Sequence, residues 1–245
     1  MNTKLALLRV RKILLALLHD TARRALLRHR VLAAMEHSNV INFGYSMVVD
    51  VGANRGQFAL AVRSLLPECH IISFEPLPAP ANEAAVVFGD DQRFELRKLA
   101  LGHETGKADI HISGKDDSSS LLPISDRQSN TFPGTEEVGR LCIEVVRLDD
   151  FLGDRRIPQK SLLKIDTQGF ELSVLRGAGR RLSDFSAIYC ECSYVELYSG
   201  QALASDIVSY LADNGFKLTG VYHTGFDDDG LCLQSDMLFQ RAFGL

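Results

Sequence analysis

The chain has 245 residues, of which 46% are hydrophobic and 24% are charged, and its formal net charge is −4 at pH 7. This is the composition of an ordinary globular protein, and the length allows a large buried core. The sequence contains no internal repeat and no low-complexity tract, which excludes the repeat and low-complexity classes.

The first part of the chain differs from the rest in charge. Residues 1–37 hold eight Lys or Arg against two acidic residues, a local charge of +6 that leaves the remainder at −10. The acidic remainder argues against nucleic acid as a partner. The longest wholly apolar run of the segment, residues 13–18, is far shorter than the ~20 residues that span a membrane. Because no secretory cleavage pattern follows it, we predict a cytoplasmic protein.

This segment has no glycine or proline before Gly44, which predicts an N-terminal helical extension over residues 1–43 and one domain over residues 44–245. Two interpretations of the extension remain open. Its helices pack on the sheet or on a second subunit, which predicts a homodimer. Alternatively, residues 1–37 form a basic amphipathic helix that rests peripherally on the anionic inner face of a membrane.

The rest of the chain is organised around one strand–turn–helix stretch. Residues 47–49 are apolar, as in a parallel strand buried on both faces, and Asp50 ends the run. Gly52 and Gly56 then frame a tight turn, and apolar residues follow at helical spacing. Glycines let the backbone approach a ligand closely, and the helix N-terminus offers free N–H groups. The stretch therefore predicts the cofactor-binding turn of an α/β unit.

This turn departs from the dinucleotide-binding fingerprint. Asn54 stands where that fingerprint needs its second glycine, and a side chain there crowds a pyrophosphate. A ligand without phosphates, such as S-adenosylmethionine (SAM), meets no such conflict. Residues 70–74 read as the next strand, with Glu75 at its tip and Pro76 preventing its extension. An acid about 20 residues after the glycines predicts a carboxylate on the two ribose hydroxyls.

Three further segments complete this half of the chain. Residues 79–89 predict a second crossover helix, and residues 94–102 predict a third strand. The small apolar residues at the tip of that strand, Ala100 and Leu101, suit the flat adenine ring. Residues 114–139 are rich in Ser, Asp, Thr, Pro and Gly. A loop of that length is typically disordered or functional, and we predict a lid that carries substrate contacts.

A second chemical centre follows. Residues 162–165 predict a central strand, Asp166 lies at its carboxyl end, and Gly169 turns the chain. Glu171 opens the next helix, where a carboxylate favours the helix N-terminus. Glu191 lies near the tip of the following strand. We predict that Asp166 binds or deprotonates the substrate. A proton or a cation shared between Glu191 and Asp166 is left as an alternative, because two carboxylates alone do not make a metal site.

The chain ends differently from a dinucleotide-binding domain. Residues 216–222 and 237–241 predict two strands joined by a turn. A terminal hairpin added to a doubly wound sheet is the layout of class I methyltransferases, whose last strand inserts antiparallel. The predicted fold class is therefore α/β, with a doubly wound, mostly parallel seven-stranded sheet and a C-terminal antiparallel hairpin.

The five cysteines include no zinc-type Cys-x-x-Cys pair, so no metal site is expected. Cys142, Cys190 and Cys192 lie within predicted strands. They are therefore expected to be buried free thiols in a reducing compartment.

With these motifs in hand, the chain resembles the FkbM family of SAM-dependent methyltransferases. The matching blocks are residues 49–56, 74–76, 100–102, 118–123, 148–150, 163–171 and 236–239. The most specific of them is the Lys-Ile-Asp-x-x-Gly-x-Glu pattern that begins at Lys164. The resemblance implies SAM as cofactor and O-methylation of a hydroxyl on a sugar, glycolipid or polyketide-type small molecule.

Methyl transfer to a hydroxyl requires alignment of the reactants and a group that accepts the hydroxyl proton. Asp166 is the first candidate for that group and His223, just after a predicted strand, is the second. Ser120 is predicted to hydrogen-bond the cofactor, although a solvated loop serine fits the sequence as well.

Two other functions fit parts of the pattern. A nicotinamide-dependent oxidoreductase shares the sheet, but Asn54 and the terminal hairpin disfavour it. A non-catalytic ligand-binding module on the same scaffold is disfavoured because Asp50, Glu75 and Asp166 are all present.

Overall fold

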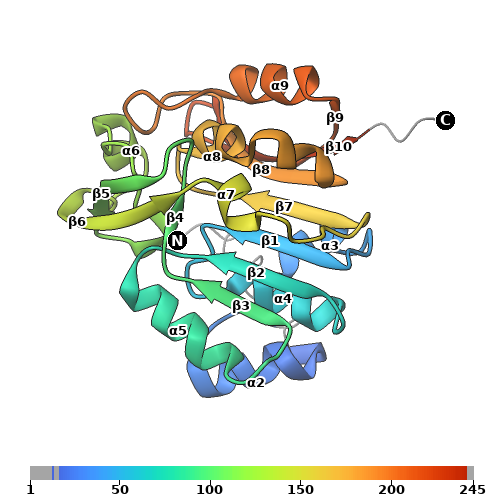
Figure 1. The fold of residues 1–245 in the computed structure, drawn as a ribbon. Coiled ribbons are helices and arrows are strands. Elements are labelled where there is room, and N and C mark those ends of the chain that lie inside the picture. The colour runs from blue at the N-terminus through green and yellow to red at the C-terminus, as the bar shows by residue number, and fades with distance from the viewer. Residues whose placement is uncertain (1–12, 14–16, 242–245) are drawn as a thin grey trace. The chain divides into compact units, whose positions relative to one another are not determined.

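The computed structural model describes Ile13 and residues 17–241 (Figure 1). The chain divides into two compact units, Met1–Lys98 and Leu99–Leu245, and each is considered by itself. None of the helices in the described part of the chain is both long enough and apolar enough to cross a bilayer.

Unit 1 is built on parallel strands that alternate with helices. β1 pairs with β2, and β2 pairs with β3, both in parallel. All five residues of β1 are buried, as the apolar run predicts for a strand covered on both faces. The elements are α2 (Asp20–His29), η1 (Met35–His37), α3 (Ser38–Ile41), β1 (Met47–Val51), α4 (Gln57–Leu65), β2 (His70–Phe74), α5 (Pro78–Phe88) and β3 (Phe94–Arg97).

The helices of unit 1 are joined by packing and by one buried cation. Phe88 at the end of α5 stacks on Phe94 at the start of β3, with ring centroids 3.7 Å apart. Arg63 on α4 is buried and donates to Asp91 Oδ2 at 2.7 Å and to the Cys69 carbonyl oxygen at 2.8 Å. A buried guanidinium needs such partners, so Arg63 ties α4 to the loops that precede β2 and β3.

The N-terminal helices are only partly described. α2 contacts α4 and α5, with Ala22 and Ala25 buried, while Leu27 on its outer side is 72% exposed. Much of the basic segment lies outside the described residues. The extension over residues 1–43 and its contact with a membrane or a second subunit therefore stay predictions.

Unit 2 carries a second set of strands. β7 and β8 are parallel, and β10 is antiparallel to both β8 and β9. The elements in chain order are β4 (Ala100–Leu101), β5 (Gly106–Ser113), η2 (Asp116–Ser118), α6 (Asp126–Thr131), β6 (Glu137–Val146), α7 (Leu148–Leu152), β7 (Ser161–Ile165), α8 (Glu171–Ala178), η3 (Gly179–Asp184), β8 (Ala187–Ser193), α9 (Ala204–Asp213), β9 (Phe216–Phe226) and β10 (Cys232–Arg241).

Seven strands form one sheet in the order β3-β2-β1-β7-β8-β10-β9. The last strand, β10, is inserted antiparallel between β8 and β9. This arrangement confirms the predicted fold class, a mostly parallel seven-stranded sheet with a C-terminal antiparallel hairpin.

A small second sheet corrects the predicted third strand. That strand ends at Arg97 instead of continuing to residue 102. Ala100 and Leu101 form β4, which pairs in parallel with Val145 and Val146 of β6. Together with β5 they make a three-stranded sheet in the order β4-β6-β5. The ladder with β6 was invisible in the sequence because its two partners are more than 40 residues apart.

The predicted lid is more ordered than its composition suggests. It contains η2, α6 and the first residues of β6. The Ser125 hydroxyl accepts from the Gln128 N–H at 3.2 Å, as an N-cap, and donates to the Leu197 carbonyl oxygen at 2.7 Å. These bonds fasten the segment to the chain that follows β8.

The cysteines fit their prediction in part. Cys190 and Cys192 are buried free thiols, but Cys142 is exposed, so its predicted burial is wrong. Cys142 lies on a side of β6 whose alternate residues face solvent, and strand membership alone does not decide which face is covered.

Two glycines set how α8 approaches β4. The N–H of Gly102 donates to the Val146 carbonyl oxygen at 3.0 Å. Gly177 on α8 lies against this backbone, so a Cβ at residue 177 would overlap the Gly102 carbonyl oxygen. α8 can lie this close to β4 only because residue 177 has no side chain.

We therefore expect Gly177→Ala to destabilise the protein. In an exposed helix the same change adds up to ~1 kcal/mol of stability. Here overpacking should instead cost about 1–3 kcal/mol, measured as a lower denaturation midpoint. Gly139→Ala is the matched control, because a Cβ there meets open space. A Gly177→Ala variant at least as stable as wild type would contradict the close packing.

Candidate functional site

In unit 1 the glycine turn is fastened to the end of β2. The N–H groups of Gly52 and Ala53 both donate to the Phe74 carbonyl oxygen at 3.0 Å. Gly52, Asn54 and Gly56 have φ of 77°, 48° and 81°. Asparagine is one of the few residues other than glycine that adopts this left-handed region readily, which is why Asn54 fits the second glycine position.

Gly56 also has a packing reason to be glycine. A Cβ at this position would lie 2.8 Å from Cε2 of the Phe88 ring. The turn therefore enters α4 by passing directly over α5, and a side chain at residue 56 would separate the two helices.

Glu75 braces the same turn. It is only 6% exposed, and its Oε2 accepts from the Asn54 N–H at 2.8 Å while its Oε1 accepts from the Leu77 N–H at 2.8 Å. Pro76, which has no N–H of its own, lies between the two bonds. These two bonds hold the Glu75 carboxylate in one orientation at the tip of β2.

Asp50 is the next-to-last residue of β1, which ends at Val51. It is fully buried, and in the parallel ladder it lies opposite Ser73 of β2. A carboxylate at the carboxyl end of a parallel strand faces the edge where doubly wound sheets bind ligands. Unit 1 thus gathers Asp50, the glycine turn and Glu75 at the ends of two adjacent strands, as predicted.

Three residues predicted to contact the cofactor lie in unit 2. Ala100 and Leu101 are buried in β4. Ser120 is 1% exposed, donates to the Gln168 carbonyl oxygen at 2.6 Å and accepts from the Leu122 N–H at 3.0 Å. Its hydroxyl proton is therefore committed within the protein, and its role toward a cofactor stays a prediction.

Strand register places three carboxylates of unit 2 in one row. Ile165 lies opposite Cys190, so Asp166 and Glu191 follow paired positions, and Asp236 of β10 lies directly opposite Glu191. Paired positions on neighbouring strands present their side chains to the same face of a sheet. The sequence showed two of these acids but not Asp236, because the pairing of β10 with β8 is long-range.

Polar side chains separate and hold these acids. Gln168 Nε2 donates at 2.8 Å both to Asp166 Oδ1 and to Glu191 Oε2. Gln234 Nε2 donates to Glu191 Oε1 at 2.6 Å, and Lys164 Nζ lies 3.6 Å from Asp166 Oδ2. The Gln168 amide thus lies between the Asp166 and Glu191 carboxylates. The sequence left a shared proton or cation between these two acids as an alternative.

The turn after Asp166 is held by Glu171. Its Oε1 accepts from the N–H groups of Thr167 and Gly169 at 2.9 and 3.0 Å, and from the Thr167 hydroxyl at 3.1 Å. Glu171 therefore caps this turn. Because Glu171 has that role, the 37% exposed side chain of Asp166 is available for other contacts.

Burial raises the pKa values of two of these acids, Glu191 and Glu171. Burial raises the pKa of Glu191 well above its ordinary value, and the negative charges of Asp166, Asp236 and Glu171 raise it further, against Lys164. Burial raises the pKa of Glu171 to about 7, against the hydrogen bonds it accepts. Strong shifts of this kind gather at functional sites.

His223 has its own acidic partner. Its Nδ1 lies 2.9 Å from Asp236 Oδ2, to which the Tyr189 hydroxyl donates at 3.2 Å. A carboxylate beside Nδ1 favours the tautomer that carries its proton on Nδ1. His223 has φ of 47°, an uncommon conformation for a side chain of this size. Asp236 and Tyr189 are the residues of this group that the sequence did not reveal.

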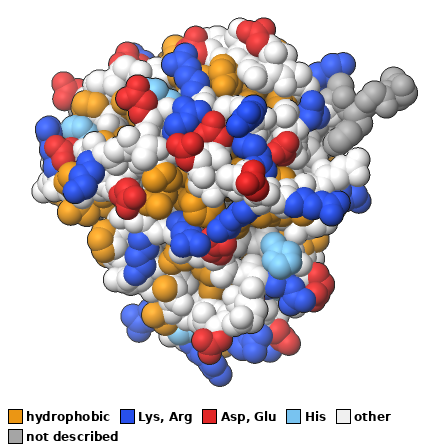
Figure 2. Space-filling model, in the orientation of Figure 1, with side chains coloured by type: hydrophobic (Ala, Val, Ile, Leu, Met, Phe, Trp, Pro, Cys, Tyr) orange, Lys and Arg blue, Asp and Glu red, His pale blue; other side chains and the backbone are white. Residues whose placement is uncertain are grey.

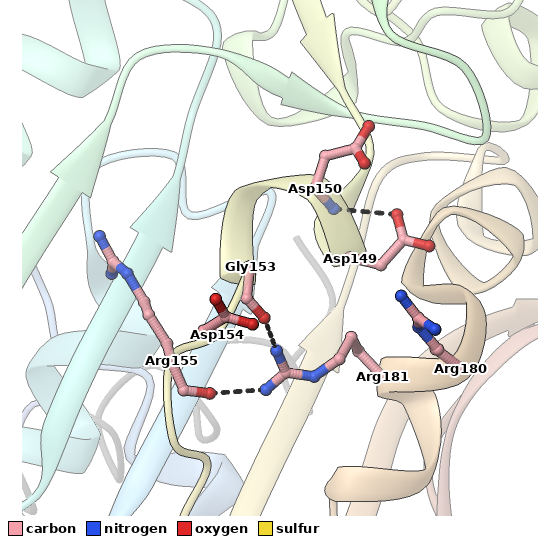
Figure 3. A pocket seen from close by; sticks show the side chains of 7 residues that line it. All are labelled: Asp149, Asp150, Gly153, Asp154, Arg155, Arg180 and Arg181. Carbon is pink, nitrogen blue, oxygen red and sulfur yellow. Dashed lines mark hydrogen bonds between the residues drawn. The ribbon is translucent and has the colours of Figure 1, made fainter.

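A pocket of about 510 Å³ lies elsewhere in unit 2 (Figure 3). Its lining belongs to segments that precede β7 and β8, so it lies at the amino ends of these strands, opposite to Asp166. Arg181 crosses it, donating to the carbonyl oxygens of Gly153 and Arg155. No predicted site residue lines it; the lining is Asp149, Asp150, Gly153, Asp154, Arg155, Arg180 and Arg181.

The raised pKa of Glu171 predicts a pH-dependent stability. Below pH 4.5 the carboxyl is protonated in both states; between 4.5 and about 7 the unfolded chain ionises and the folded one does not. Stability from this group therefore falls by roughly 3 kcal/mol as pH rises through that window.

Glu171→Gln keeps the accepting oxygen and removes the titration. The free energy of unfolding of the variant minus that of wild type should rise by roughly 3 kcal/mol from pH 4.5 to 7, measured by denaturant titration. Glu68→Gln, whose side chain is 82% exposed, should show no such trend. A constant difference for Glu171→Gln would contradict the shift.

The chain is similar in sequence to known proteins. The methyltransferase FkbM domain model matches residues 50–218, more than half of the chain. The 2-O-methyltransferase NoeI of Sinorhizobium fredii is 28% identical over 191 residues, covering 76% of this chain and 78% of that protein. Methyltransferase 1 of Beauveria bassiana is 28% identical over 144 residues, 54% of this chain and 58% of its own length.

Among solved structures, M. capricolum TrmK in complex with S-adenosyl-homocysteine has a TM-score of 0.46 and 8% identity, over 84% of this chain and 67% of that one. So distant a likeness carries no argument. The family match and the strand order together are decisive: the chain belongs to the FkbM family of methyltransferases.

Proposed function

We propose that this methyltransferase uses SAM to methylate a hydroxyl of a sugar, glycolipid or polyketide-type small molecule. The observation that carries the proposal is Glu75 at the tip of β2, whose two oxygens accept from the backbone N–H groups of Asn54 and Leu77, so that the carboxylate is held in one orientation. A carboxylate held at that place suits a vicinal diol such as that of a ribose. The relative NoeI, which is named as a 2-O-methyltransferase, supports oxygen as the methyl acceptor.

The residues of unit 1 fit SAM without any phosphate-binding feature. Gly52 and Gly56 provide the bare backbone against which a ligand can pass. Asn54 occupies the place where a dinucleotide would need glycine. We assign Asp50, Gly52, Asn54, Gly56, Glu75 and Pro76 to the cofactor, and keep Ala100, Leu101 and Ser120 as weaker candidates from unit 2.

The residues of unit 2 fit the acceptor. SAM, when bound, supplies a methyl group already activated on a sulfonium. The protein then has to orient the acceptor hydroxyl and take its proton as the new C–O bond forms. The Asp166 carboxylate, held by Gln168 and Lys164, is placed to do both. His223, oriented by Asp236, is the second candidate base.

Other partners stay proposals of lower rank. On the face drawn in Figure 2, basic and acidic side chains are interspersed, which does not suit the continuous basic surface that nucleic acid requires. We retain peripheral membrane contact through residues 1–37, a homodimer and a cytoplasmic location as predictions.

Binding calorimetry tests the cofactor. Wild type should bind SAM and not NAD, and SAM at 100 times its Kd should add about 2.7 kcal/mol of stability. Glu75→Ala should weaken SAM binding by roughly 1.5–3 kcal/mol, the range for hydrogen bonds to a charged group. Glu68→Ala, on the exposed surface of the same unit, should bind as wild type does.

Glu75→Ala also leaves the Asn54 and Leu77 N–H groups without their acceptor, so its melting temperature without ligand should fall. A variant that melts lower yet binds SAM normally would reduce Glu75 to a brace. Binding of NAD in place of SAM would support the oxidoreductase instead.

Asp166→Asn tests the proton acceptor. The change keeps the size of the side chain but removes its charge, so kcat should fall by about 10²–10⁴-fold with SAM affinity little changed. Transfer of radiolabelled methyl from SAM to a panel of sugars, glycolipids and hydroxylated polyketides measures it.

His223→Gln is the comparison variant in this assay. If Asp166→Asn retains wild-type kcat while His223→Gln loses it, the role of base passes to His223 and Asp236. If both retain wild-type kcat, neither residue is the base.

A further inference from the structure

Gln168 has an unusual backbone conformation and a fully engaged side chain. Its φ is 56°, in the left-handed region that few residues other than glycine and asparagine adopt. Such a conformation persists only when the surrounding contacts determine it. It occurs within the Lys164–Glu171 motif, two residues after Asp166.

The contacts of Gln168 come from three parts of unit 2. The Tyr198 hydroxyl lies 2.9 Å from Gln168 Oε1, and the Gln168 carbonyl oxygen accepts from Ser120. The neighbouring Gly169 is packed so tightly that a Cβ there would lie 3.1 Å from Tyr198 Cβ and from Gln201 Cβ. The backbone and the far end of the amide are therefore both fixed.

These contacts also settle which way the amide points. Its Nε2 faces two carboxylate oxygens, Asp166 Oδ1 and Glu191 Oε2, and its Oε1 faces a hydroxyl. Exchanging the two would set an amide oxygen against two carboxylates and would lose both donated hydrogen bonds. Both N–H groups are thus committed, one to each acid.

The consequence for the two acids is different. Glu191 also accepts from Gln234 and is the acid whose pKa is raised well above its ordinary value by burial. Asp166 is the more exposed acid; Gln168 Nε2 donates to its Oδ1, and Lys164 Nζ lies 3.6 Å from its Oδ2. The other ionisable groups of unit 2 that act on this acid pair are Glu171, Tyr189, Tyr198 and Asp236.

We propose that Gln168 is a positioning residue for methyl transfer, whose amide fixes the Asp166 carboxylate toward the acceptor hydroxyl. This rests on the proposed role of Asp166. Without the amide, Asp166 would be free to rotate, and nothing would separate it from Glu191. The lysine alone, 3.6 Å away, is beyond a good hydrogen bond and fixes no orientation.

The test compares two glutamines that differ in one contact. Gln168→Met preserves side-chain length and removes the donors to Asp166 and Glu191. Gln234→Met removes a donor to Glu191 only. In the radiolabelled assay, kcat of Gln168→Met should fall about 10–100-fold, since misplacement by ~1 Å costs about that much, while acceptor KM and SAM Kd stay within about twofold. Gln234→Met should retain most of the wild-type kcat.

A second measurement needs neither acceptor nor SAM. In protein with ¹³C-labelled aspartate, the Asp166 carboxyl signal, assigned with Asp166→Asn, should move in Gln168→Met and stay in place in Gln234→Met. If Gln168→Met does not fold, Gln168→Glu fits the same space and should move the signal as well. An unmoved signal, or a folded Gln168→Met with wild-type kcat, overturns the proposal. If the wild type does not bind SAM, the proposed function is overturned. The Asp166 carboxyl signal would still test whether Gln168 fixes the Asp166 carboxylate, because that measurement needs no SAM.

Discussion

Withdrawing carboxylates from water is the constraint on which the site in unit 2 depends. An acid removed from solvent must be hydrogen-bonded, paired or protonated. Glu171 is stabilised by the turn it closes, and Asp166 by Gln168 and Lys164. Glu191, between two other acids, has its pKa raised well above its ordinary value by burial. The three acids thus reach three different solutions within one short motif and the strand beside it.

In unit 1 the buried carboxylate of Glu75 is stabilised by backbone N–H groups. Two backbone N–H groups, from Asn54 and Leu77, hold the oxygens of Glu75. Because those donors belong to the glycine turn and to the start of α5, the acid and the turn order one another. A preformed carboxylate loses little conformational freedom on binding a diol, which favours affinity.

Much of the fold followed from local pattern. Continuous apolar runs predicted β1 and β7, and both strands are buried along their whole length. Two glycines predicted the turn before α4, and both have positive φ. The position of an acid just after a strand singled out Glu75 and Asp166. Each of these signals depends on residues within one strand and its turn. The mostly parallel sheet with its C-terminal antiparallel hairpin followed from the alternation of strand and helix and from the two terminal strands.

Pairings between distant segments were decided only by the tertiary structure. The sequence by itself determined the strands, the glycine turn and the acids at the strand ends, because hydrophobic period and backbone preference act locally. It did not determine that Ala100 leaves the main sheet, that Asp236 orients His223, or that Gln168 lies between Asp166 and Glu191. Those contacts depend on register and on packing across 13 to 45 residues of chain, where the residue types alone allow many partners and only the folded arrangement selects one.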